Sequence, residues 1–338
     1  MSNNFFDQDV KIQTESLTAF AHEILKKYGI SDAEVKCINF EFNATFSVLT
    51  QSGQKYALRL NINSTRTVPN IQAETQWVRD LARIPTINVP TPIATLNDEY
   101  LVSAHHADSD QTIYGVMYSW LEGEELGDEP TLDQLHTVGR AMALLHENSS
   151  HFKLTDGAEL PTFSDFFWGT EDFLFSSKSV IPPRERELLQ QAHDLIVKYT
   201  DELYATSEVH IIHADLHGWN LMWHEDQVSI FDFDDCGYGV EAQDIAVALY
   251  YLDTPEQEVA LLDGYKSIRL LPTYSENAMK ALLVQRRLFL LSYLYETKNP
   301  EHKEMLPAYL EKTIERVSTF LTDAVSYTHL TLPTILRV

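Results

Sequence analysis

The sequence contains little cysteine, few basic residues and no long uninterrupted apolar run. Cys37 and Cys236 are its two cysteines in 338 residues. A disulfide framework is therefore excluded, and a reducing, cytoplasmic location is predicted. Lysine and arginine total 25 against 50 aspartates and glutamates, a net charge of -25. This balance argues against binding to a nucleic-acid backbone and favours a cationic small substrate.

Membrane and secretory segments are also missing from the pattern. The opening MSNNFFDQDVKIQ has no basic start followed by an apolar run, so no secretory signal is predicted. The most apolar helix-like stretch, residues 281–295, is interrupted by Gln285, Arg286 and Arg287. We expect a buried helix there rather than a membrane span. The sequence leaves the oligomeric state open.

The final residues differ in composition from everything before them. A charge-rich helical pattern changes abruptly to VSYTHLTLPTILRV, which resembles the translated end of a sequencing adapter. We therefore exclude residues 326–338 from the fold and treat the natural C-terminus as undetermined. A genuine flexible tail is the alternative.

The hydrophobic pattern changes from alternating to helical along the chain. Residues 34–42, 44–50 and 55–62 alternate as strands do, whereas residues 70–83 and 132–147 carry apolar residues at helical spacing. We predict an α+β fold with a small strand-rich N-terminal lobe over residues 1–121. A larger, mostly helical lobe follows over residues 122–325, and the two join near residues 119–123. A chain of this length is near the size at which one core becomes two.

Oxygen-bearing side chains gather between His210 and Gly239. Asn220 follows Asp215 by five residues, and Asp232 comes after a predicted hairpin with strands at 220–223 and 228–231. Mg²⁺ prefers such oxygen ligands, and a carboxylate outside the metal shell can orient a hydroxyl or take its proton. The spacing H-x-D-x-x-x-x-N, followed by a strand and an aspartate, is the pattern of kinase catalytic loops.

The segments HADLHGWNLMW, VSIFDFDDCGYG and DIA resemble the aminoglycoside phosphotransferase and choline kinase-like families, relatives of protein kinases with the same two-lobed fold. The resemblance covers residues 15–322. It implies that Asp215 is the catalytic base or orients the hydroxyl, and that Asn220 and Asp232 hold Mg²⁺. It also implies that Asp244 braces the catalytic loop from behind; a charge that complements the helix dipole is the alternative.

The resemblance also implies a nucleotide grip in the strand-rich lobe. KYALRL matches the kinase strand with Ala-x-Lys, so Ala57 would face adenine. Arg59 stands where the lysine belongs and would clamp phosphates. Its expected partner is Glu74 on the next helix, for which an unpaired surface charge is the alternative.

The turn that would cover the phosphates lacks the glycines of protein kinases. Asn43 and Thr45 stand in their places, and the chain has neither a Gly-rich loop nor a P-loop. Backbone groups from Ser119 to Leu121 would read the adenine edge. ATP is the expected donor, with GTP as the alternative.

The histidines suggest a competing class. His210, His213, Asp215 and His217 form H-x-x-H-x-D-x-H, which also resembles a zinc-hydrolase cluster. We prefer the kinase interpretation because it accounts in addition for the asparagine, the later aspartate and the strand-rich lobe. His213 is then expected to hold the loop, and His217 to lie near the acceptor or cap the loop. Asp234 is expected to bind a second metal or a cationic acceptor, or to be a solvated or capping acid.

These interpretations predict a magnesium-requiring phosphotransferase that moves the γ-phosphate of ATP to a hydroxyl group. The acceptor would be a small cationic molecule (an aminoglycoside, an amino-alcohol or an amino sugar), with Glu241 lining its site. The alternatives are a stress-response Ser/Thr protein kinase and a nucleotide-binding pseudokinase scaffold. Ala214 replaces the arginine of H-R-D and no A-P-E segment follows, so no control by activation-loop phosphorylation is predicted.

Overall fold

The computed structural model describes residues 5–155, 157–297 and 299–327, with side chains up to residue 323. Contacts within the chain divide it into two compact units. The first comprises residues 1–160 and 218–235, and the second comprises residues 161–217 and 236–338. Most of the doubtful tail, residues 328–338, lies outside the described residues.

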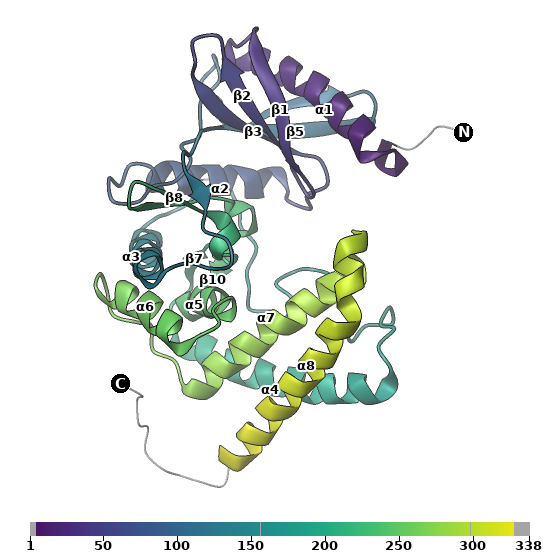
Figure 1. The fold of residues 1–338 in the computed structure, drawn as a ribbon, viewed down its shortest axis with the longest axis vertical. Helices are drawn as coiled ribbons and strands as arrows, with labels where there is room; N and C mark the ends of the chain where they lie inside the picture. Colours follow the sequence, from purple (N-terminus) through teal and green to yellow (C-terminus); the bar gives the residue numbers. More distant parts are fainter. Residues whose placement is uncertain (1–4, 156, 298, 328–338) are drawn as a thin grey trace. The chain divides into compact units, whose positions relative to one another are not determined.

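An antiparallel sheet with the strand order β1-β2-β3-β5-β4 forms the strand-rich part of the first unit (Figure 1). Side chains alternate between its two faces. Phe46, Leu58 and Leu60 are fully buried on one face, in a shared core with Leu17 and Phe20 of α1. The opposite face is therefore the one left for polar side chains. The elements are α1 (Val10–Leu25), β1 (Ala33–Phe40), β2 (Ala44–Thr50), β3 (Lys55–Asn61), β4 (Val102–His106) and β5 (Gln111–Ser119).

Two helices and a small second sheet complete the first unit. The helix α2 starts with a reciprocal cap in which Thr67 and Asn70 satisfy each other's backbone N–H groups. The small sheet has the order β6-β8-β9, and Ile230 N–H bonds to the carbonyl of Asn88 at 2.9 Å. The elements are α2 (Val68–Leu81), α3 (Leu132–Ser149), β6 (Glu124–Glu125), β8 (Leu221–His224) and β9 (Gln227–Ile230), with the short 3-10 helices η1 (Phe5–Asp7), η2 (Lys26–Tyr28), η3 (Gly218–Asn220) and η4 (Phe233–Asp235).

The second unit is mainly helical. Three long helices, α4, α7 and α8, bury a common core that includes Leu189, Leu288 and Val317, and α5 packs on α7 (Figure 1). A short antiparallel ladder of β7 and β10 lies before α5. The elements are α4 (Pro183–Thr206), β7 (His210–Ile212), β10 (Gly237–Gly239), α5 (Glu241–Tyr250), α6 (Pro255–Lys266), α7 (Glu276–Glu296) and α8 (Pro300–Tyr327).

Most elements lie where the alternation and the helical spacing place them, including the hairpin before Asp232. We predict residues 218–235 in the helical lobe, whereas their contacts group them with the first unit, because β8 pairs with β6. The lobe boundary after residue 121 stays a prediction. The apolar stretch of residues 281–295 lies in α7, and no helix among the described residues is long and apolar enough to cross a membrane.

The assignment of buried and exposed side chains in the large sheet can be tested by mutation. Leu58→Ala removes a fully buried side chain of β3 and is expected to lower the free energy of unfolding by about 3 kcal/mol, because a cavity remains. Leu49→Ala on neighbouring β2 truncates a side chain that is 40% exposed and should change it by less than about 0.5 kcal/mol. Urea unfolding of both variants measures the difference, and equal losses would contradict the assigned faces.

Candidate functional site

A buried ion pair lies on the polar face of the large sheet. Arg59 of β3 donates from Nη1 to Oε1 of Glu74 at 2.8 Å and from Nη2 to Oε2 at 2.5 Å. Both residues are nearly inaccessible, at 7% and 3% exposure. The Tyr118 hydroxyl donates to the same Oε1 at 3.2 Å. The pair expected between strand and helix is present, so Glu74 is not an unpaired surface charge.

Asp234 of η4 adds a second carboxylate to this pair. Its Oδ1 lies 3.8 Å from Arg59 Nη2, and its Oδ2 accepts from Asn43 Nδ2 at 3.0 Å. Burial alone would lower the pKa of Arg59, but the charges of Glu74, Tyr118 and Asp234 raise it well above its ordinary value. The guanidinium is therefore a permanent cation held by two acids. Asp234 is neither a solvated acid nor a helix cap here, because its carboxylate contacts Arg59 and Asn43.

The remaining nucleotide-side residues share that sheet face. Thr45 is the cross-strand neighbour of Arg59, and Ala57 packs with Tyr118 beside it. Asn61 Nδ2 donates to Asn43 Oδ1 at 3.0 Å, which orients the Asn43 amide. The contacts on this face thus join side chains that lie 14 to 61 residues apart in the sequence.

The predicted connector begins where β5 ends. The backbone N–H of Ser119 bonds to the carbonyl of Thr91 at 2.8 Å, and its hydroxyl accepts from Thr91 N–H at 2.8 Å. The N–H of Ser119 is therefore already used. Any reading of an adenine edge falls to the following residues, which include Leu121.

Asn220 and Asp232 lie together at one end of the β8–β9 hairpin. Phe231 N–H bonds to the carbonyl of Asn220 at 3.1 Å, directly before Asp232. Asn220 is buried, whereas Asp232 is exposed and has a left-handed backbone with φ 59°. Phe233, packed edge-on against Trp77 with ring centroids 5.4 Å apart, anchors the turn. An amide oxygen and a carboxylate placed in this way suit a hard divalent cation that keeps water and phosphate as its other ligands.

Gly218 begins the segment that carries Asn220. A Cβ on this residue would lie 1.8 Å from the carbonyl oxygen of Gly127, and Gly127 N–H bonds to the Gly218 carbonyl at 3.1 Å. Only glycine permits this approach of two backbones. The contact therefore fixes the start of η3 in the first unit.

In the second unit, a fully buried carboxylate holds the loop that carries Asp215. Asp244 of α5 accepts from His213 N–H at 2.9 Å and from Ala214 N–H at 2.6 Å. Ala214 has φ 67°, a conformation that non-glycine residues adopt at a cost. These two bonds compensate that cost. The contacts are those expected of a brace behind the loop.

The carboxylate of Asp215 is itself paired. Arg286 of α7 donates from Nη2 to Asp215 Oδ1 and, at 2.8 Å, to the Tyr251 hydroxyl. His217 Nε2 lies 3.3 Å from Asp215 Oδ2. Burial by itself would raise the pKa of Asp215, but Arg286, followed by His217 and His213, holds it well below its ordinary value. Asp215 is consequently ionised across the neutral pH range.

The histidines do not form a recognisable zinc site. His213 is fully buried and its Nδ1 accepts from Asp215 N–H at 3.3 Å, while the His210 ring lies 3.4 Å from Glu208. Across the residues that the structure describes, no group of three or more histidine, cysteine, aspartate or glutamate side chains is arranged to hold a metal ion. The zinc-hydrolase alternative thus finds no support in the described residues.

Glu241, which is predicted to line the acceptor site, has partners within the protein. It is 8% exposed, accepts from Arg269 Nη1 at 2.8 Å and also hydrogen-bonds to Tyr265. A buried glutamate with a cationic partner is compensated within the protein. Its observed contacts are therefore structural.

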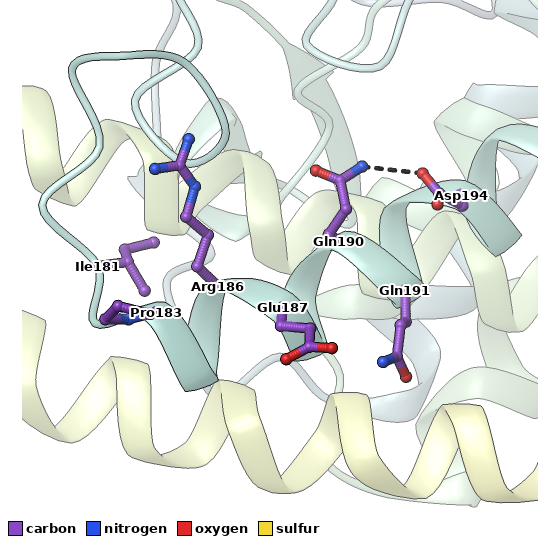
Figure 2. A pocket seen from close by; sticks show the side chains of 7 residues that line it. All are labelled: Ile181, Pro183, Arg186, Glu187, Gln190, Gln191 and Asp194. Atoms are coloured by element: carbon purple, nitrogen blue, oxygen red, sulfur yellow. Dashed lines mark hydrogen bonds between the residues drawn. The ribbon is translucent and has the colours of Figure 1, made fainter.

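A surface pocket of about 460 Å³ lies at the start of α4, and none of its lining residues is a predicted site residue (Figure 2). Arg186 is the cation among its lining residues, and it donates to the carbonyls of Phe175 and Ser176. Gln190 donates to Asp194 at 2.8 Å, as the dashed line shows. Arg186, Gln190 and Asp194 of this pocket therefore already have partners within the protein.

Three residues near the predicted site residues were not found from the sequence: Tyr118, Tyr251 and Arg286. Arg286 carried a usable signal, because arginine inside a strongly apolar helix is seldom buried without a specific partner. The two tyrosines carried none, since alternating or helical aromatic residues usually belong to the core.

Solved structures of known phosphotransferases share this fold. A microcompartment-associated aminopropanol kinase matches with a TM-score of 0.77 at 24% identity, covering 90% of this chain and 98% of that one. An amicoumacin kinase solved with AMP-PNP, Ca²⁺ and Ami matches with a TM-score of 0.69 at 17% identity, covering 91% and 96%. The predicted fold class, α+β and related to that of protein kinases, is confirmed.

The pattern of the phosphotransferase enzyme family matches residues 40–276. This chain belongs to that family, which confirms the resemblance drawn from its motifs. Amicoumacin kinase of Bacillus subtilis (strain 168) is 25% identical over 229 residues, or 68% of this chain and 66% of that protein. The chain thus matches just under two thirds of the length of this curated relative.

Glu74→Gln tests the buried pair on the sheet. The amide keeps the shape of the side chain but leaves Arg59 without its main counter-charge, so the free energy of unfolding should fall by about 3 kcal/mol. Glu147→Gln on α3 removes a charge that is 55% exposed and should cost less than about 0.5 kcal/mol. Urea unfolding compares the two, and similar small losses would mean that the pair is not desolvated.

Asp244→Asn tests the brace of the second unit. The amide retains one acceptor oxygen for two buried N–H groups, so the loop should lose about 2 kcal/mol or more of stability. Hydrogen exchange at His213 and Ala214 measures the effect locally, and Asp253→Asn at an exposed position just after α5 is the control. Unchanged protection in Asp244→Asn would refute the brace.

Proposed function

We propose that this protein transfers the γ-phosphate of ATP, with Mg²⁺, to a hydroxyl group of a small amine-bearing molecule. Membership of the phosphotransferase enzyme family supports the reaction class. The observation that carries the nucleotide assignment is the buried Arg59–Glu74 pair, which keeps a permanent cation on the same sheet face as Asn43 and Thr45. GTP is the alternative donor.

The proposed roles follow the chemistry of each side chain. Arg59, aligned by Glu74 and Asp234, neutralises phosphate oxygens, and Ala57 leaves room for the base. Asn220 and Asp232 hold the magnesium ion, whose charge offsets that of the transferred phosphate when it is bound. The backbone that follows Ser119, up to Leu121, reads the adenine edge.

Asp215 receives the acceptor. Its ionised carboxylate accepts a hydrogen bond from the acceptor hydroxyl, aims the oxygen at phosphorus and takes the hydroxyl proton as the new O–P bond forms and ADP leaves. His213 and Asp244 hold the backbone of this loop, and His217 lies beside the carboxylate. Because the transition state of phosphoryl transfer is loose, orientation matters more than the basicity of this group.

An amino-alcohol or an aminoglycoside-like amine is the proposed acceptor. The kinases that this chain resembles are named for amicoumacin and aminopropanol. The surplus of 50 acidic over 25 basic residues favours a cation at the surface. We place the enzyme in the cytoplasm, where ATP is supplied and its two cysteines stay reduced.

Coupled ADP release with Mg-ATP tests the proposal. The acceptor panel comprises aminopropanol, ethanolamine, choline, homoserine, amino sugars, aminoglycosides, amicoumacin and a basic protein, with Asp215→Asn as the blank. A small-molecule signal that vanishes in the blank supports the proposal. Labelling of the protein substrate alone would favour a protein kinase, and nucleotide binding without any transfer would favour a pseudokinase.

Asp215→Asn and Asp232→Asn should separate catalysis from metal binding. Asp215→Asn is expected to lower kcat by about a thousandfold or more while Mg-nucleotide binding is kept. Asp232→Asn should weaken Mg-dependent nucleotide binding itself. Calorimetric titration with a nonhydrolysable ATP analogue, with and without Mg²⁺, measures both; equal turnover in the two variants and the parent would refute the assignment.

A further inference from the structure

The proposed catalytic carboxylate is held by an arginine that follows it by 71 residues. We infer that Arg286 is a positioning residue for phosphoryl transfer: it fixes Asp215 through Oδ1 and so presents Oδ2 to the acceptor hydroxyl. This inference rests on the proposed function. No part of the motif pattern around Asp215 specifies such a partner.

The surroundings of Arg286 keep its guanidinium in one place. The residue is 6% exposed, and its guanidinium carbon lies 5.6 Å from the ring centroids of both Tyr251 and Phe289. One nitrogen, Nη2, bonds to both Asp215 Oδ1 and the Tyr251 hydroxyl. A planar guanidinium confined by two rings and two acceptors has little freedom to rotate, so the carboxylate that it binds is fixed as well.

The other carboxylate oxygen has a different neighbour. His217 Nε2 lies 3.3 Å from Oδ2, and the His217 ring packs on Tyr251 with centroids 4.6 Å apart. Tyr251 therefore contacts both residues that flank Asp215. The His217 contact with Oδ2 is longer than the contact of Arg286 with Oδ1, and Tyr251 holds the Arg286 guanidinium in addition, so an acceptor hydroxyl would displace His217 more readily than Arg286. The geometry thus assigns Oδ2 to the acceptor.

The charges facing Asp215 make this arrangement specific for a hydroxyl. Arg286 and Tyr251 face it from α7 and the end of α5, and His213 and His217 face it from its own loop. Because Arg286 compensates the negative charge of Asp215, the carboxylate offers little attraction to an ammonium group. Asp215 would orient the acceptor oxygen, and the amine would be recognised by other groups.

Arg287 provides a matched control on the same helix. It is 5% exposed and bonds to the Thr313 hydroxyl at 2.9 Å, the Tyr250 hydroxyl at 3.2 Å and the Tyr309 carbonyl at 3.2 Å. It is as buried as its neighbour, but its hydrogen bonds connect α7 to α5 and α8. A merely structural arginine should behave like Arg287.

The experiment compares kcat and KM for the best acceptor of the panel in the parent, Arg286→Gln, Arg286→Lys and Arg287→Gln, from about pH 5.5 to about pH 8.5. In the parent, the low pKa of Asp215 keeps it ionised throughout. Without Arg286, burial remains and raises that pKa, so kcat of Arg286→Gln should fall toward acid pH. We expect the deficit in kcat relative to the parent to grow about tenfold from the alkaline to the acid end of this range. The reason is that, below its pKa, the ionised fraction of a carboxyl group falls about tenfold for each pH unit.

The controls separate positioning from folding. Arg286→Lys keeps the positive charge and should therefore restore most of the kcat that Arg286→Gln loses at acid pH. Arg287→Gln should lower the stability of the protein without changing the shape of the pH profile of kcat. A profile of Arg286→Gln parallel to that of the parent overturns the inference, even if its activity is lower. So does a loss confined to KM, because positioning of Asp215 acts on the transfer step.

A readout without turnover distinguishes failure of this inference from failure of the proposed function. Thermal unfolding at neutral pH is measured for Arg286→Gln, Asp215→Asn and the double variant, as a double-mutant cycle. The loss caused by Arg286→Gln should be clearly smaller when Asp215 is already neutral. If the two substitutions show no coupling, the Asp215–Arg286 pairing is wrong, whether or not the enzyme is active. If the parent transfers phosphate to none of the acceptors, only the proposed function is refuted.

Discussion

The polar face of the large sheet depends on the compensation of one buried cation. Arg59 cannot lose its proton at any physiological pH, so its burial between β3 and α2 requires acids within reach. Glu74 supplies two oxygens in the flat geometry of a guanidinium, and Asp234 supplies a third contact from a different part of the first unit. The hydrogen bond from Asn43 to Asp234 then extends this order to the turn before β2. A single unavoidable charge thereby organises the whole face.

Buried charges in the second unit, two carboxylates and a further arginine, are compensated in the same way. Asp215 is compensated by Arg286, Glu241 by Arg269, and Arg287 by hydroxyl, carbonyl and aromatic groups. Basic residues are scarce in this chain, 25 against 50 acidic residues. The two buried arginines of α7, Arg286 and Arg287, both have hydrogen-bond partners. Such pairs contribute little net stability compared with apolar packing, but removal of one partner is costly. They are better understood as devices for orientation, which is what phosphoryl transfer requires.

Two backbone positions carry strain next to the proposed catalytic groups. Ala214 and Asp232 both adopt left-handed conformations, although neither is glycine. Ala214 is held by the two hydrogen bonds of its peptide segment to Asp244, and Asp232 follows directly after the hairpin closed by Phe231. Strain of this kind persists only where surrounding contacts exceed its cost, and it is concentrated at functional sites. Its place here, one residue before Asp215 and at Asp232 itself, agrees with the roles proposed for both.

The sequence by itself determined the family, the fold class, most strands and helices, and the motif that contains Asp215, Asn220 and Asp232. Those features are local: alternation, helical spacing and motif intervals are properties of neighbouring residues. Only the tertiary structure decided which buried charges form pairs. In the first unit, Arg59 pairs with Glu74 and Asp234. In the second unit, Glu241 pairs with Arg269, and Asp215 pairs with Arg286. These contacts join residues 15 to 175 positions apart, and nothing in a single sequence records which buried charge meets which. Burial makes every such charge need a partner, but the packing of the chain chooses the partner.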